Sequence, residues 1–192
     1  LLSVIEQQML PRCTIDGMIL RALRYYFSDR NGGRDAAGEA DTTPIDGVKW
    51  AAYAGRWYEW ARYETPFEFE LDEVYTDYTM EADGALSITN YGTDTKGHQK
   101  KATAKAGIAG EGKLSVSFIP FLRFLSTPYH VLYVDEAYSR ALVSNESGSC
   151  LWLLGRTPLY TASAYRQLLN EAALRGFNTQ HLRQTEHRQQ AL

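Results

Sequence analysis

The feature that most constrains the fold of this chain is a series of short segments, between residues 55 and 156, in which apolar and polar side chains alternate. Alternation with a period of two is typical of strands with one buried face. Clusters of Gly, Asn, Asp and Pro divide the segments, and most clusters are short enough for hairpin turns. No helix of crossover length intervenes, which excludes parallel βαβ units. The eight predicted strands are 55–63, 71–81, 85–91, 99–108, 113–119, 129–134, 138–144 and 151–156.

Eight sequential antiparallel strands predict an all-β fold, an up-and-down barrel that leaves no exposed edges and has room for one small ligand. A two-sheet sandwich is the competing arrangement. After the strands, Tyr165, Leu168, Leu169 and Ala172 have helical spacing, with Thr161 as N-cap and Gly176 as terminator. We expect one amphipathic helix, packed on the outside of the barrel.

The domain organisation follows from this pattern. Residues 28–47 are rich in Gly, Asp and Thr and have almost no large apolar side chains, so they cannot offset the entropy of ordering by burial. We therefore expect a poorly ordered N-terminal extension at 1–46, the barrel and helix at 47–185, and a polar tail at 186–192.

Composition excludes several classes of protein. A chain of 192 residues with 44% apolar residues favours one globular domain, and a net charge of −3 offers no footprint for nucleic acid. Two cysteines, Cys13 and Cys150, suit neither a disulfide framework nor a four-ligand zinc site. The longest mostly apolar stretch, 124–134, is too short for a membrane-spanning helix. We predict no metal and no cofactor.

The start of the sequence carries no readable export signal. The chain begins with Leu1, without a positively charged start followed by an apolar stretch and a cleavage site. Cys13 follows Leu10, Pro11 and Arg12, where a lipid-acceptor motif would have small residues.

Several motifs appear together at characteristic distances. The first strand opens with the G-x-W pattern at 55–57, Asp83-Gly84 occupies the next hairpin, and the last strand runs into Gly155-Arg156-Thr157-Pro158. From about residue 45 to 182 the chain resembles the lipocalin family, in particular the bacterial outer-membrane lipoprotein type, which is related to apolipoprotein D. The triplet at 76–78 spells a second lipocalin signature but lies in the wrong strand, and the counterpart is Val134-Asp135-Glu136.

The resemblance implies a binding protein that holds a fatty acid or a lysophospholipid for storage or transport in the cell envelope, with membrane association as a further expectation. The alternative is a lipocalin-fold enzyme of the isomerase or de-epoxidase type, which needs a nucleophile or general acid inside the barrel. Cys150 is the one thiol with inward parity, and we identify no catalytic residues.

Strand directions in such a barrel bring Trp57, near the start of the first strand, to Arg156, near the end of the last. We expect the guanidinium to stack on the indole beside Gly55 and to close the base of the barrel. Strand 129–134 is apolar on both faces: Tyr129, Val131 and Tyr133 or His130, Leu132 and Val134 could face inward, and the resemblance to apolipoprotein D favours the second set. The predicted ligand-binding lining is Glu59, Ala61, Thr76, Tyr78, Ile88, Asn90, Val116, Phe118, His130, Leu132, Val143, Trp152 and Leu154.

The segment Phe118 to Leu125 is unusually apolar for a loop. It is either a surface for a membrane or a homodimer partner, or a lid over the mouth of the barrel.

Overall fold

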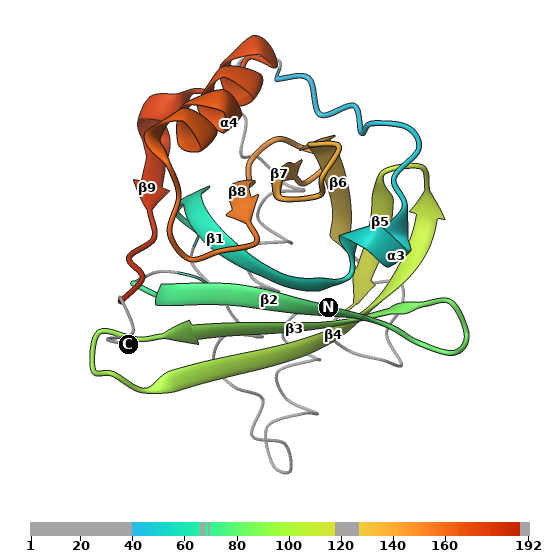
Figure 1. Ribbon diagram of the computed structural model, residues 1–192. Helices are drawn as coiled ribbons and strands as arrows, with labels where there is room; N and C mark the ends of the chain where they lie inside the picture. The colour runs from blue at the N-terminus through green and yellow to red at the C-terminus, as the bar shows by residue number, and fades with distance from the viewer. Residues whose placement is uncertain (1–39, 66–67, 69, 118–126, 189–192) are drawn as a thin grey trace, which may run out of the picture.

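The computed structural model describes residues 40–188 except 66–67, 69 and 118–126, and its centre is a closed barrel (Figure 1). Each predicted strand segment overlaps one strand of the barrel. The strands are β1 (Gly55–Tyr63), β2 (Asp72–Met80), β3 (Leu86–Thr93), β4 (Gln99–Gly110), β5 (Lys113–Ser117), β6 (Thr127–Val134), β7 (Arg140–Ser144) and β8 (Leu151–Gly155).

Strand β1 closes the barrel by pairing on both of its edges. Gly55 lies opposite Tyr78 of β2, and Tyr58 lies opposite Gly155 of β8, both in antiparallel register. From β2 to β8, neighbouring strands in the sheet are also consecutive in the sequence, in the order β2-β3-β4-β5-β6-β7-β8. The predicted up-and-down barrel is confirmed, and the closure excludes the sandwich.

Two irregularities in the strands change which side chains face inward. The register of β1 against β8 shifts between Glu59 and Ala61, and the register of β6 against β7 shifts between Val131 and Tyr133. An extra residue in one strand reverses the facing of every residue beyond it. Simple alternation therefore fails in the second half of β1.

Helix α4 (Ala162–Leu174) packs on the outside of the barrel, as predicted (Figure 1). The Thr161 hydroxyl accepts a hydrogen bond from the backbone N–H of Ala164, and Gly176 ends the helix with φ of 85°. Leu168 and Ala172 are fully buried against outward-facing residues of the strands.

The segment 40–46 lies against the barrel, and the rest of the predicted N-terminal extension, 1–39, lies outside the described residues. The N–H of Asp41 donates to the carbonyl of Arg175 at 2.7 Å, and the N–H of Ile45 donates to the carbonyl of Val131 at 2.9 Å. These bonds to distant elements compensate for the small apolar content of the segment.

The C-terminal residues return to the barrel as well. A short helix η2 (Thr179–His181) leads into β9 (Leu182–Gln184), which pairs with the second half of β1. Beyond it, the carbonyl of Glu186 accepts from the N–H of Glu73 at 2.8 Å. The predicted polar tail is therefore attached to the barrel through residues 186–188.

Candidate ligand-binding site

A single-turn helix, α3 (Trp50–Tyr53), closes the end of the barrel where β1 begins. The indole N–H of Trp57 donates to the carbonyl of Tyr53 at 2.7 Å. The guanidinium carbon of Arg156 lies 3.9 Å from the centre of the Trp57 ring, so the predicted stack is present. Arg156 also donates to the carbonyls of Ala52 and Tyr53. Strand β8, strand β1 and α3 are thus bound together at this end.

Gly55 fits the close approach of Arg156. Its φ is 97°, a backbone conformation that other residues rarely adopt. A Cβ at this position would lie 3.3 Å from Nη1 of Arg156, which donates to the carbonyl of Arg56. Glycine is therefore the residue that this end of the barrel tolerates.

The interior next to this closed end is lined by buried apolar side chains from all eight strands of the barrel. Small residues alternate with larger ones, which leaves the walls uneven. The buried residues facing the interior are Trp57, Tyr78, Leu86, Ile88, Ala104, Ala106, Leu114, Val116, Val131, Ala141, Val143 and Leu154.

Three tyrosine hydroxyls meet inside this apolar lining. Tyr78 donates to the hydroxyl of Tyr129 at 2.8 Å, and the hydroxyls of Tyr53 and Tyr129 lie 3.0 Å apart. Burial raises the pKa of all three phenols, because it disfavours the charged form. The hydroxyls are therefore neutral near pH 7.

Farther from the closed end, inward-facing side chains remain partly exposed. Thr76 donates to the side-chain oxygen of Asn90 at 2.8 Å, and both residues are only half-buried. Tyr129 and Trp152, whose rings stack with centroids 6.5 Å apart, also keep exposed surface. Four inward-facing side chains at this level thus keep accessible surface.

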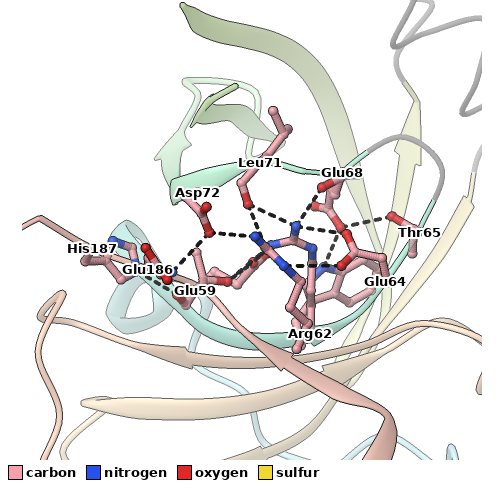
Figure 2. Close-up of polar contacts among 12 residues, drawn as sticks. Glu59, Arg62, Glu64, Thr65, Glu68, Leu71, Asp72, Glu186 and His187 are labelled. Carbon is pink, nitrogen blue, oxygen red and sulfur yellow. Dashed lines mark hydrogen bonds and ion pairs between the residues drawn. The ribbon is translucent and has the colours of Figure 1, made fainter. Parts of the chain in front are cut away.

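Arg62 is the central residue of a charged cluster at the opposite end from α3 (Figure 2). The irregularity in β1 places it opposite Trp152, and its side chain is fully buried. Its Nη1 donates to the carboxylate of Glu59, which is also buried, and its Nη2 donates to the carbonyls of Glu68 and Leu71 at 2.6 and 3.0 Å. Nearly all of its donors are satisfied, although Nε has no partner among the described residues.

Residues from the C-terminal segment complete the cluster. The hydroxyl of Thr185 donates to Glu59, and Arg183 forms ion pairs with Glu64 at 3.3 Å and with Asp72 at 3.0 Å. The segment after α4 thus ties the β1–β2 loop to the barrel wall.

Glu68 carries the most perturbed carboxyl group of this cluster. Burial and the nearby charge of Glu59 raise its pKa to about 8, despite the opposing effects of Arg62 and of hydrogen bonds from Trp152 and Thr65. Trp152 Nε1 donates to its Oε2 at 3.1 Å. Glu68 is therefore mostly protonated at pH 7, next to the ring that faces the interior.

Many of the predicted lining residues face the barrel interior, but not all of them. Thr76, Tyr78, Ile88, Asn90, Val116, Val143, Trp152 and Leu154 line it, and Glu59 lies at its charged end. Phe118 and the apolar segment 118–125, including its predicted homodimer and lid roles, lie outside the described residues.

Three predicted lining residues lie on the outer face instead. Ala61 and Leu132 pack with the residues under α4: Ala61 follows the irregularity in β1, and Leu132 alternates with the inward-facing Val131. His130 is buried under the N-terminal segment, with Nδ1 2.9 Å from the carbonyl of Thr42. In β6 the inward set is Tyr129, Val131 and Val134.

The sequence reasoning missed four residues of the interior: Tyr53, Arg62, Glu68 and, as a lining residue, Tyr129. Arg62 had a signal, because Glu59 is an inward-facing carboxylate that needs a partner and Arg62 lies three positions later. Tyr53 and Glu68 had none, since a single-turn helix and a loop show no periodicity.

The chain belongs to the lipocalin family, because the family model described as a lipocalin-like domain matches residues 48–187. Members of this family bind small hydrophobic ligands in the barrel.

Within the family the chain is a lipocalin of the Blc type. It is 36% identical over 145 residues to the outer membrane lipoprotein Blc of Vibrio cholerae, covering 72% of this chain and 82% of that protein. It is 32% identical over 149 residues to temperature-induced lipocalin-1 of Arabidopsis thaliana, covering 73% and 80%.

Solved structures show the same fold. Insecticyanin from the tobacco hornworm Manduca sexta superposes with a TM-score of 0.66 at 16% identity, over 81% of this chain and 89% of that one. The cockroach allergen Per a 4 superposes with a TM-score of 0.63 at 14% identity, over 79% and 95%.

Two features are absent from the residues that the structure describes. Within these ranges, no three His, Cys, Asp or Glu side chains gather in a way that could hold a metal ion. No helix in the described part of the chain has the length and apolar character needed to cross a membrane.

Proposed function

We propose that this protein binds a fatty acid or a lysophospholipid inside its barrel and stores or carries it in the cell envelope. The observation that carries the proposal is the contrast along the barrel axis. Arg156, Trp57 and α3 seal one end, whereas Tyr129 and Trp152 face the interior and remain partly exposed. An apolar interior that is sealed at one end suits an elongated apolar ligand.

The names of the relatives support the proposed location. Proteins named outer membrane lipoprotein Blc are 31% to 36% identical to this chain. On that likeness we propose a cell-envelope location and membrane association for this protein.

A steric pair of variants tests the site. Ala104 faces the interior and is buried, whereas its neighbour Thr103 faces out from the same strand and is exposed. Ala104→Phe should fill part of the interior and weaken the binding of a fluorescent polyene fatty acid at least tenfold, whereas Thr103→Phe should leave binding unchanged. Thermal melts of both variants identify any loss of folding. If the wild-type protein binds neither the fatty acid nor lysophosphatidylcholine, the proposal fails.

We propose binding without chemical conversion. Cys150 is buried in the β7–β8 hairpin, where its backbone N–H donates to the side chain of Asn145 at 2.9 Å. Mass spectrometry of lipid released from the protein should return the added lipid unchanged. Turnover that Cys150→Ser abolishes would favour an enzyme instead.

A further inference from the structure

The hydroxyls of Tyr53, Tyr78 and Tyr129 form a hydrogen-bonded group inside the barrel. They come from three separate elements: the last residue of α3, the end of β2 and the start of β6. Tyr53 is 0% exposed and Tyr78 is 4% exposed. The surrounding lining is apolar, so few other groups there can satisfy a hydroxyl.

This group of three hydroxyls has one more O–H donor than its hydrogen bonds use. Three hydroxyls carry three protons, and the group contains two hydrogen bonds, between Tyr78 and Tyr129 and between Tyr53 and Tyr129. Two protons are used. The third has no acceptor among the residues that the structure describes, and a buried hydroxyl proton without an acceptor is destabilising.

Tyr129 is the best placed of the three to hold the spare proton. It is common to both hydrogen bonds, and a hydroxyl can accept two hydrogen bonds while donating one. It is also the one that keeps exposed surface, next to the ring of Trp152. Its proton can therefore point away from Tyr53 and Tyr78, on the side of Trp152.

The surroundings favour a neutral acceptor over an anionic one. The nearest cation, Arg156, already directs its N–H groups at backbone carbonyls of Ala52, Tyr53, Arg56 and Tyr138. A carboxylate brought to Tyr129 would be buried with no cationic N–H group free to donate to it, which is costly. A ketone, aldehyde or ester oxygen has no such cost.

We infer that Tyr129 donates a hydrogen bond to a neutral carbonyl oxygen on the buried part of the ligand, held in place by Tyr53 and Tyr78. The site thus selects oxygenated acyl chains over plain ones. This inference rests on the proposed function, because it assumes that an acyl chain enters the barrel past Trp152.

The test uses a series of hexadecanoic acids, each with one ketone at a different chain position, and hexadecanoic acid itself. Dissociation constants are measured by competition with a fluorescent fatty acid for the wild-type protein and for Tyr129→Phe. Tyr133→Phe is the control, because Tyr133 lies on the same strand but faces out and accepts a bond from Gln167.

We expect one ketone position to bind the wild-type and Tyr133→Phe proteins about fivefold more tightly than hexadecanoic acid, the effect of one hydrogen bond. In Tyr129→Phe this preference should be lost, so that no ketone position binds more tightly than hexadecanoic acid itself. The inference is wrong if no ketone position is preferred, which is the result expected when a water molecule accepts the hydrogen bond of Tyr129. It is also wrong if the preference survives in Tyr129→Phe. Failure of the wild-type protein to bind any of these acids would instead refute the proposed function.

Discussion

Replacing Glu68 by Gln should change how the stability of this protein depends on pH. The pKa of Glu68 is raised from 4.5 to about 8 in the folded protein, so between these values the folded chain holds a proton that the unfolded chain releases. Stability should therefore fall as pH rises, by about 1.4 kcal/mol per pH unit for one proton. Over three units, from pH 5 to 8, the loss approaches about 4 kcal/mol as an upper limit.

The physical cause is the position of the carboxyl group. It lies against Trp152 and near the negative charge of Glu59, and ionisation would add a second buried negative charge beside it. Glutamine can accept the same bond from Trp152 and does not ionise, so Glu68→Gln should be free of this contribution.

The assay is urea denaturation at pH 5, 6, 7 and 8. Glu70→Gln is the control, because Glu70 belongs to the same loop and is exposed. The slope of unfolding free energy against pH should be more negative for the wild-type and Glu70→Gln proteins than for Glu68→Gln. Equal slopes in all three proteins would show that Glu68 ionises normally and would refute this reasoning.

Three further substitutions test the two ends of the barrel and its wall. Arg62→Met should destabilise the protein by about 3 to 5 kcal/mol in urea denaturation, because it leaves Glu59 buried without its partner; adding Glu59→Gln should recover part of the loss, and no recovery would argue against the pair. Trp57→Ala should mainly lower the melting temperature, by a free energy of about 3 to 5 kcal/mol, and near-normal stability with lost ligand binding would contradict a structural role. Gly155→Ala should lower the free energy of unfolding by more than about 2 kcal/mol, because its Cβ would lie 2.0 Å from the Trp60 ring. Gly107→Ala, with open space around it, should change that free energy by less than about 0.5 kcal/mol. Similar melting temperatures for both glycine variants would refute this packing.

The inward faces of several strands could be predicted from the sequence. Inward and outward residues alternate without interruption in β3, in β8 and in β2 from Tyr75 onward. The inward facing of Tyr78, Ile88 and Leu154 was therefore assigned correctly. The stack of Arg156 on Trp57 followed from strand direction alone. These assignments need only the period of a strand and the connectivity of a barrel.

Other residues could not be assigned this way. In β6 both faces are apolar, because one lines the interior and the other is covered by α4 and by residues 40–46. Alternation cannot distinguish two buried faces, so the choice of His130 over Tyr129 was wrong. The irregularity after Glu59 has no signature in the sequence and moved Ala61 out and Arg62 in.

By itself, the amino-acid sequence determined the eight barrel strands, their antiparallel order, the outer helix and the pair at the closed end, because each depends on local periodicity or on chain direction. Only the tertiary structure decided which buried polar groups meet inside the barrel. Glu59, Arg62 and Glu68, like Tyr53, Tyr78 and Tyr129, come together because barrel closure, a bulge and two short segments without periodicity bring distant residues to one place. Because burial removes these charges and hydroxyls from water, each needs a hydrogen-bond or ion-pair partner within the fold.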